Sequence, residues 1–210
     1  MHEPLVSVVT PTWRRHSVLL TRCVPSVQAQ QWPFEHLVVS DGPDPVLRAY
    51  PWPASVRFSE VPVHHLEPHW GHWARLAALE LARGEFIAYL DDDDCWEPGH
   101  LRALAGALLA EPEADFAFSR ALVHLETQVV RIGDGRPSHG RVQSSMLMHR
   151  RSLLTTATWE CAHPAEDWLL VQAWLQSGAE YASVDEVTVH HYPSVSGDRV
   201  LAAGPPPEQV

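Results

Sequence analysis

The stretch that decides the fold is residues 85–94, which read EFIAYLDDDD. Residues 85–90 form a short, mainly apolar run of the kind found in strands buried on both faces of a parallel sheet. Four aspartates, Asp91 to Asp94, follow directly. Carboxylates crowded at the end of a buried strand raise the electrostatic energy of the folded state unless a cation or the donors of a bound ligand neutralise them. The stretch therefore predicts a buried strand with an acidic ligand site at its carboxyl end.

A divalent metal is the simplest ligand for this acidic run. Oxygen ligands suit Mg²⁺ or Mn²⁺, and Mg²⁺ usually binds through one or two carboxylates with substrate phosphates completing its shell. The run therefore indicates a site for a metal and a diphosphate. The alternative is a solvated acidic turn that binds nothing.

The rest of the chain alternates strands and helices before residue 112 and is richer in strands after it. We expect a first helix that begins with Ser17 as a cap and that Pro25 kinks or stops. A second helix should span residues 71–83, with Gly84 closing it, and a third should follow Pro98. A fourth should run from residue 166 to Gly178. We expect strands at residues 5–10, 36–40, 56–61, 85–90, 115–119, 121–125, 129–132 and 184–190. Residues 133–140 are expected to form a mobile loop.

Composition limits the class of protein. The net charge of −11, from 26 acidic and 15 basic residues, argues against nucleic acid or anionic membrane as a partner. The cysteines Cys23, Cys95 and Cys161 are widely spaced and indicate neither a disulfide framework nor a structural zinc site. The chain shows no cationic leader and no run near the ~20 apolar residues that span a bilayer. We therefore expect a cytoplasmic protein without an integral membrane segment.

Four segments in order resemble the family 2 glycosyltransferases. Residues 84–94, followed by Trp96 and Pro98, are similar to the signature block of that family. Residues 6–13 resemble its first strand and nucleotide loop, residues 37–42 its second strand and acidic turn, and residues 166–168 the segment with its catalytic acidic pair. Each segment is short, but the ordered set is specific.

The resemblance implies an α/β fold of GT-A type (nucleotide-diphospho-sugar transferase, Rossmann-like), with a central, mostly parallel sheet flanked by helices. Residues 1–112 would form the nucleotide-sugar-binding half of one domain and residues 113–200 its acceptor-binding and catalytic half. Residues 201–210, which include three consecutive prolines, are expected to be a disordered tail.

The resemblance also implies a donor site. The position of Asp41 accepts a hydrogen bond from a uracil N–H, and the aromatic position held by Trp13 packs on the base; a carboxylate and a flat indole suit these roles. The alternatives are a turn residue before Gly42 and a core tryptophan. Arg14 stands where the family often has asparagine. The residues assigned to the nucleotide sugar are Pro11, Thr12, Trp13, Arg14, Asp41, Arg75, Asp91 and Asp92.

For the metal, the resemblance implies Asp93 together with Asp91 and His191, and the expected ion is Mn²⁺ or Mg²⁺. Asp94 would cap the next helix or face the acceptor. A strand would point His190 and His191 to opposite sides, so that only one faces the site. The alternative is a solvent-facing pair. A less favoured interpretation is a zinc site in the group His64, His65, His69 and His72.

The chemistry that the resemblance implies is displacement at an anomeric carbon. Asp167, beside Glu166, would remove the proton of the attacking acceptor hydroxyl, which contributes roughly 10² to 10⁴ in rate. Direct displacement inverts the anomeric configuration. The alternative is an ordinary helix-capping pair. Trp96 and Trp159 are the preferred candidates for sugar stacking, and Ser144 and Ser145 are expected on the acceptor side.

These expectations combine into a metal-dependent, inverting glycosyltransferase. It would move a sugar from a nucleoside-diphosphate sugar, with UDP favoured, to a hydroxyl on a small or soluble acceptor. A nucleotidyltransferase is the enzymatic alternative, although the chain lacks a glycine-rich loop with a basic residue to cradle a triphosphate. A non-catalytic nucleotide-sugar-binding module would have no need for a base at Asp167, and a generic α/β interaction protein would bind no nucleotide.

Overall fold

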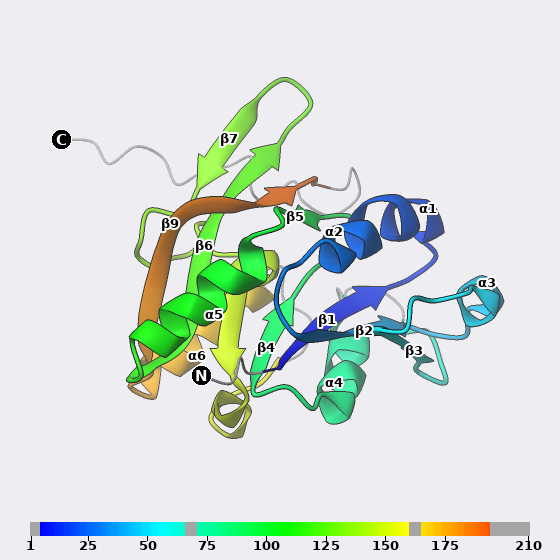
Figure 1. The fold of residues 1–210 in the computed structure, drawn as a ribbon, viewed down its shortest axis with the longest axis horizontal. Helices are drawn as coiled ribbons and strands as arrows, with labels where there is room; N and C mark the ends of the chain where they lie inside the picture. The colour runs from blue at the N-terminus through cyan, green and yellow to red at the C-terminus, as the bar shows by residue number, and fades with distance from the viewer. Residues whose placement is uncertain (1–4, 66–70, 160–164, 194–210) are drawn as a thin grey trace.

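The structure is a computed structural model that describes residues 5–65, 71–159 and 165–193. Figure 1 shows the elements around one mixed sheet. The strands are β1 (Val6–Thr12), β2 (Phe34–Ser40), β3 (Val56–Glu60), β4 (Phe86–Tyr89), β5 (Cys95–Trp96), β6 (Ala114–His124), β7 (Val129–Ile132), β8 (Leu147–Arg150) and β9 (Glu180–His191). The α-helices are α1 (His16–Val18), α2 (Val24–Gln28), α3 (Pro45–Ala49), α4 (His72–Leu81), α5 (His100–Ala110) and α6 (Glu166–Gln176). A π-helical turn, η1 (Leu19–Cys23), and two 3₁₀ turns, η2 (Ser144–Met146) and η3 (Arg151–Thr155), complete the set.

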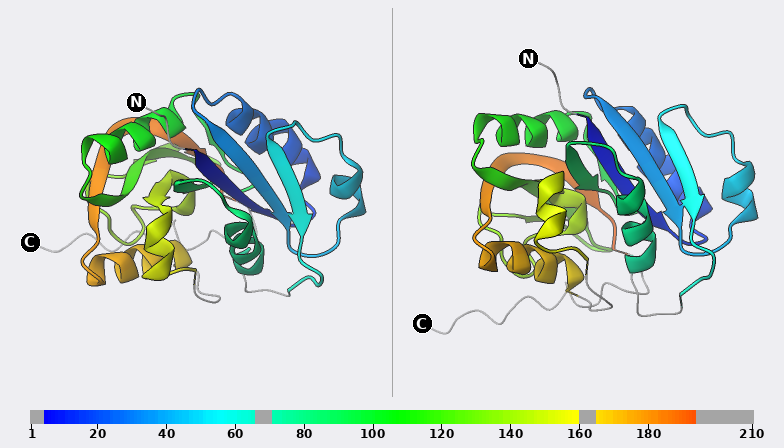
Figure 2. Two further views of the ribbon diagram at one scale, coloured as in Figure 1. Left: turned by 60° about the horizontal axis from the view of Figure 1, so that its bottom comes forward. Right: turned by 90° about the horizontal axis from the view of Figure 1, so that it is seen from below.

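The sheet has the strand order β3-β2-β1-β4-β8-β6-β9-β5, with β7 paired to β6. The first four strands are mutually parallel, and β8 joins β4 in antiparallel fashion to bring in the second half of the chain. Helices α2 and α5 cover one face, whereas α4 and α6 lie on the other (Figures 1 and 2). The α/β prediction is confirmed.

The order of the parallel strands creates a ligand-binding edge. The chain passes from β1 outward to β2 and β3, then returns to β4 on the other side of β1. The carboxyl ends of β1 and β4 therefore adjoin at the point where the strand order reverses, which is where open α/β sheets bind ligands. Every residue of β1 and of β4 is buried, as expected for strands covered on both faces.

The second half of the sheet differs from the expectation in two places. Residues 115–119 and 121–125 do not form separate strands, because β6 continues through them from Ala114 to His124. Its pairing with β9 is irregular near Phe118, Arg120 and Ala121, so a bulge absorbs what the sequence suggested was a turn. Strand β8 was not expected. The loop at residues 133–140 connects β7 to η2, and its mobility stays a prediction.

The first helical segment also differs from the expectation. Ser17 lies inside α1, and the residue at the cap position is Arg15, which makes no side-chain capping bond. Pro25 does not stop the helix. The preceding π-turn lets the Val24 N–H reach the Leu19 carbonyl, and Pro25 then occupies the first turn of α2, where a missing N–H costs nothing.

Gly84 does not close α4, which ends at Leu81. The Gly84 N–H donates a hydrogen bond to the buried hydroxyl of Ser7 at 2.8 Å. A Cβ at this glycine would lie 2.5 Å from the Ser7 nitrogen and 2.8 Å from the Leu5 carbonyl oxygen. Glycine is required here because the backbone that enters β4 passes directly against β1. Gly178, by contrast, follows the end of α6 in a left-handed conformation (φ 90°), as expected.

Within the described residues, we find no helix that could cross a membrane. Helices α5 and α6 have 11 residues each, far fewer than the ~20 that a bilayer requires. The predicted tail, residues 201–210, lies outside the described residues.

Candidate active site

The acidic run meets the end of β1, where the nucleotide loop was expected, across the switch point of the sheet. The hydroxyl of Thr12, at the end of β1, donates to Asp92 at 2.7 Å, and Arg15 donates to the same carboxylate at 3.2 Å. Asp92 is buried, and burial raises its pKa to about 6 even though both donors favour the ionised form. The Thr12 carbonyl in turn accepts the backbone N–H of Asp41 at 2.8 Å. Three carboxyl-terminal strand ends are thus connected.

Asp93 is surrounded by negative charge and approached by two arginines. Its carboxylate accepts a hydrogen bond from Arg15, and its carbonyl accepts one from Arg22 at 2.7 Å. Burial, followed by the repulsion of Asp94, raises the pKa of Asp93 to about 7. Sequence reasoning did not single out Arg15 or Arg22. For Arg15 a signal existed, because it directly follows the nucleotide loop.

Asp91 faces the second half of the chain. It accepts hydrogen bonds from the Arg75 guanidinium at 2.8 Å and from the Ser144 hydroxyl at 3.0 Å. Arg75 also donates to Glu166, and its guanidinium lies 4.5 Å from the centre of the Trp159 ring. Arg75, which was expected to approach the donor, therefore binds the acids of both halves.

Asp94 is the most buried of the four aspartates, at 1% exposure. It accepts hydrogen bonds from the Ser145 hydroxyl at 2.7 Å, from His191 Nδ1 at 2.9 Å and from the Tyr192 N–H at 3.0 Å. Asp94 therefore does not cap the next helix, whose cap position is Gly99. It orients His191 instead, because this carboxylate holds one of the two imidazole nitrogens.

The predicted catalytic pair begins α6. Burial raises the pKa of Asp167 to about 6, while the positive charge of Arg75 and a backbone hydrogen bond from Ser144 lower it. Burial likewise raises the pKa of Glu166 to about 8, and Arg75 opposes that shift. Ser144 thus bonds to Asp91 through its hydroxyl and to Asp167 through its backbone. The acidic run and the predicted base lie in one site.

Asp41 and Trp13 lie at the other end of this edge, and two histidines accompany them. His64 stacks on Trp13 with ring centres 4.1 Å apart and bonds to Asp41 through Nδ1 at 3.1 Å. His65 Nδ1 bonds to the other carboxylate oxygen at 2.8 Å. Arg14 adopts a left-handed backbone conformation (φ 56°), and its guanidinium lies 4.7 Å from the centre of the Trp13 ring. The sequence did not predict that histidines would contact both of the residues expected to bind the nucleobase.

The predicted metal ligands are of a type that suits a metal ion, but their side chains are not arranged around one point. Carboxylate oxygens suit Mg²⁺ or Mn²⁺. Burial and then the charge of Asp94 raise the pKa of Asp93, and a bound cation would oppose both effects. In this arrangement, however, Asp93 bonds to Arg15, Asp91 to Arg75 and His191 to Asp94. The described part of the chain contains no group of three or more His, Cys, Asp or Glu side chains that could hold a metal ion. The residues therefore fit an ion held by one or two carboxylates with diphosphate oxygens in the remaining positions.

The histidine group considered for zinc is dispersed. His64 and His65 contact Asp41, whereas His72 is buried in α4 with its ring edge-on to Trp73. His69 lies outside the described residues. The three described histidines of this group, His64, His65 and His72, do not form a metal-binding cluster.

The two tryptophans preferred for sugar stacking are core residues. Trp96 is 4% exposed, stacks on His100 at 4.1 Å and donates to the Ser145 carbonyl at 2.8 Å. Trp159 is 2% exposed and packs edge-on against Tyr89. Their ring faces are covered because both lie beneath the site and not at its surface. That expectation was wrong.

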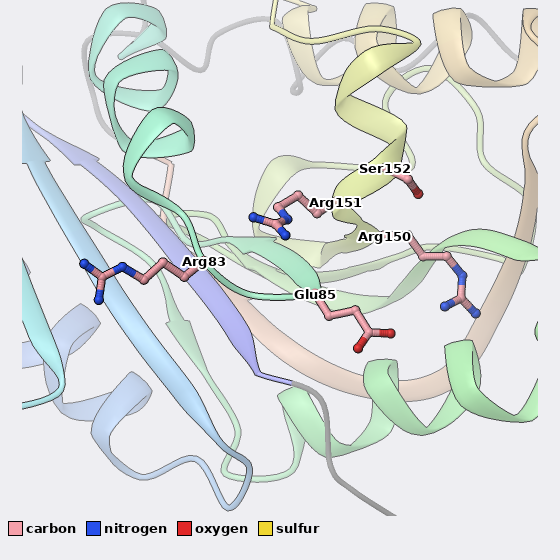
Figure 3. A pocket seen from close by; sticks show the side chains of 5 residues that line it. All are labelled: Arg83, Glu85, Arg150, Arg151 and Ser152. Atoms are coloured by element: carbon pink, nitrogen blue, oxygen red, sulfur yellow. The ribbon is translucent and has the colours of Figure 1, made fainter.

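An open cavity of about 430 Å³ lies at the opposite edge of the sheet, where β4 begins. Its lining includes three arginines and Glu85, and Figure 3 shows that the Arg83 and Arg150 side chains point apart. Arg150 donates to the carbonyls of Leu108 and Ala114 at 2.7 and 2.9 Å. The Arg150 guanidinium therefore supports the backbone on either side of the loop that follows α5.

Comparison with known proteins identifies the family. The model of "Glycosyl transferase family 2" matches residues 7–155, which include all of β1 except Val6 and the whole acidic run. This chain belongs to glycosyl transferase family 2. It is 30% identical over 119 residues to the uncharacterized glycosyltransferase YwdF of Bacillus subtilis (strain 168), covering 55% of this chain and 41% of that protein. The predicted family is confirmed.

Solved structures show the same fold. The TarS protein of S. aureus (residues 1–349), in complex with UDP-GlcNAc, matches with a TM-score of 0.70 at 20% identity, over 90% of this chain and 58% of that one. The mannosyltransferase PcManGT from Pyrobaculum calidifontis, in complex with GDP-Man and Mn²⁺, matches with a TM-score of 0.67 at 17% identity, over 94% and 59%. The GT-A fold is thereby confirmed. This chain spans 13% to 41% of the lengths of the curated relatives that it matches.

Proposed function

We propose that this chain transfers a sugar, with inversion, from a UDP-sugar to a hydroxyl of a small or soluble acceptor, and that Asp167 is the general base. The observation that carries the proposal is the position of Ser144. Its hydroxyl bonds to Asp91 at 3.0 Å, and its backbone bonds to Asp167. A carboxylate that can take a proton therefore adjoins the acids expected to hold the donor.

The protonation behaviour of Asp167 suits this role. Its pKa is raised to about 6, chiefly by burial, so the side chain is mainly ionised at neutral pH and binds a proton more tightly than an ordinary aspartate. As the acceptor oxygen attacks the anomeric carbon, its proton passes to Asp167. The bond from that carbon to the diphosphate breaks, and its electron pair leaves with the nucleotide. Attack opposite the leaving group inverts the configuration.

Asp93 and Asp91 are the proposed carboxylate ligands of Mn²⁺ or Mg²⁺, with diphosphate oxygens in most of the remaining positions and His191 as the further candidate ligand. When bound, such an ion neutralises charge on the departing diphosphate. Asp94 would act behind this group, since a carboxylate that holds one imidazole nitrogen is common next to metal-binding histidines. Glu166 is assigned a positioning role, because it bonds to Arg75, which in turn bonds to Asp91.

Asp41 and Trp13 support a uracil-containing donor. Uracil offers an N–H to a carboxylate and a flat ring to an indole. Two structural neighbours were solved with UDP-GlcNAc and with GDP-Man. Guanine also carries a ring N–H, so a GDP-sugar is the second donor to test.

The decisive experiment compares the wild type with Asp167→Asn. A panel of UDP-, dTDP- and GDP-sugars with Mn²⁺ and simple sugar acceptors identifies the working pair by mass spectrometry of the product. With that pair, Asp167→Asn should lower kcat by roughly 10² to 10⁴ while the affinity for UDP changes less than about threefold. Asp134→Asn, in the exposed loop after β7, is the matched control and should keep full activity. Undiminished turnover in Asp167→Asn would remove the base from the proposal.

The metal assignment has a test that needs no turnover. Mn²⁺ and UDP together should raise the Tm of the wild type above the effect of either alone, because linked binding stabilises the folded state. Asp93→Asn should lose most of this joint shift. If the shift persists in Asp93→Asn but disappears in Asp91→Asn, Asp93 is not the principal ligand.

A further inference from the structure

The indole of Trp13, assigned to the nucleobase, already carries a stacked ring. The imidazole of His64 lies with its ring centre 4.1 Å from that of Trp13 and an angle of 10° between the planes. This is close parallel stacking, the arrangement that a bound base would adopt on the same indole. The His64 side chain is 30% exposed, so this stack lies at the edge of the molecule and within reach of solvent.

The same imidazole also bonds to the second donor-site residue. His64 Nδ1 lies 2.8 Å from the Asp41 carbonyl oxygen and 3.1 Å from one oxygen of its carboxylate. His65 Nδ1 lies 2.8 Å from the other oxygen. Since an ionised carboxylate only accepts, both histidines donate. Each oxygen of the Asp41 carboxylate therefore already accepts a hydrogen bond from an imidazole.

The backbone beneath these rings is shaped to hold them. Gly42 has a φ of +124°, a conformation that L side chains rarely adopt. A Cβ there would lie 2.8 Å from the His64 Cβ and 2.9 Å from Cζ3 of Trp13. Both side chains thus rest on a glycine that leaves no room for any other residue. The local fold therefore holds the Cβ of His64 close to Trp13, and the imidazole reaches the indole from there.

We propose that His64 is a built-in competitor for the nucleobase. It makes with one ring the two contacts that the base needs, a stack on Trp13 and a hydrogen bond to Asp41. The base of a nucleoside diphosphate with a ring N–H, as in uracil, must displace it. This inference rests on the proposed function. The apparent affinity for the nucleotide is the intrinsic affinity multiplied by the fraction of free molecules in which His64 has already moved away, so a stable stack lowers it. The return of His64 helps to expel the nucleoside diphosphate after transfer.

The first test measures UDP binding by titration calorimetry in the presence of Mn²⁺. His64→Ala should bind UDP about 3- to 10-fold more tightly than the wild type, the range expected for removing one competing aromatic stack. UDP should also dissociate more slowly, as measured by stopped-flow displacement. His139→Ala, the same substitution at an exposed position after β7, should match the wild type.

The second test uses the unaltered protein. In a sample with ¹³C-labelled histidine, the ring protons of His64, assigned by their absence in His64→Ala, should be shifted upfield by the Trp13 ring. Saturating UDP should move these signals toward the positions of a solvent-exposed histidine. Upfield signals that persist at saturation would overturn the inference, because the base would then bind without displacing His64.

The outcomes separate this inference from the proposed function. If His64→Ala binds UDP as well as the wild type or more weakly, His64 supports the base and does not compete with it, and the proposed function stands. If neither protein binds UDP, dTDP or GDP at millimolar concentration, the proposed function fails and the competitor role fails with it. Only tighter binding in His64→Ala together with a displaced ring in the wild type supports the inference.

Discussion

Arg75 donates a hydrogen bond to Glu166, a residue 91 positions further along the chain. Both side chains are buried, at 3% and 7% exposure for the whole residues. The same guanidinium bonds to Asp91 at 2.8 Å. One arginine on α4 therefore connects the acidic run to the start of α6, and so joins the two halves of the chain.

Removing this arginine should destabilise the protein strongly. In Arg75→Met, the buried carboxyl group of Glu166 and the partly exposed one of Asp91 lose their cation, and breaking a buried pair costs about 3–5 kcal/mol. The double variant Arg75→Met/Glu166→Gln should recover part of this loss, because the second substitution removes one uncompensated acid. Urea unfolding monitored by circular dichroism gives the free energies. The exposed Arg102→Met should stay within about 0.5 kcal/mol of the wild type. A single variant Arg75→Met as stable as this control would show that the pair contributes little.

Two glycines offer a matched pair of substitutions with opposite expected signs. Gly84→Ala places a methyl group 2.5 Å from a backbone nitrogen of β1, so β1 and β4 must separate; we expect a loss of at least about 2 kcal/mol. Gly106→Ala lies within α5 with nothing within 4 Å of the new Cβ, and should gain about 0.5–1 kcal/mol. Thermal and urea unfolding of both variants decide the matter. Equal effects at the two positions would contradict the close approach at Gly84.

The rate of transfer should depend on the ionisation of Asp167. Its pKa is raised to about 6, and only the ionised carboxylate accepts a proton. We therefore expect kcat to fall as the pH drops through about 6 and to level off above about 7. Initial rates from pH 5 to 8, with folding checked by circular dichroism at each pH, measure this limb. A flat profile across that range would argue against Asp167 as the base.

Buried histidines should make the protein sensitive to acid. Burial lowers the pKa of His100 to about 3, and those of His36 and His149 to about 3 and 4. Below pH 6.5 the unfolded chain binds protons at these sites and the folded chain does not, so stability falls as the pH falls. Each histidine contributes a slope of up to about 1.4 kcal/mol per pH unit.

Substitution isolates one of these contributions. His100→Gln should reduce the loss of stability between pH 6.5 and 4.5, measured as the difference in unfolding free energy between these two pH values. The exposed His139→Gln should leave that difference unchanged. An identical acid sensitivity in wild type and His100→Gln would mean that His100 becomes protonated in the folded state well above pH 3.

The strands next to the site were predictable and the second half of the sheet was less so. Strands β1 and β4 are buried on both faces, and such strands appear in the sequence as continuous apolar runs. Strand β8 has only four residues and ends in Arg150, so its pattern is too short to distinguish a strand from a loop. The bulge in β6 gave a misleading turn signal, because an irregular register interrupts the alternation of side chains.

The acidic run was found from its residue types and the acidic pair at the start of α6 from the family resemblance, but the partners of these acids were not found. Nothing local in the sequence indicates that Arg15 bonds to Asp93 or that Ser144 bonds to Asp91. These contacts depend on β1 lying beside β4 and on η2 lying beyond its end. The buried positions of Trp96 and Trp159 depend on the same packing.

The sequence by itself determined the family, the α/β class and the identity of the acids, because buried strands need apolar runs and their carboxyl ends display the residues that follow. Only the tertiary structure decided that His64 lies on Trp13 and that Arg75 joins Asp91 to Glu166. The local pattern of apolar residues specifies which strands are buried away from water. The order of the strands specifies which distant side chains share a low-dielectric site, and it is there that hydrogen bonds and charges have their largest effect.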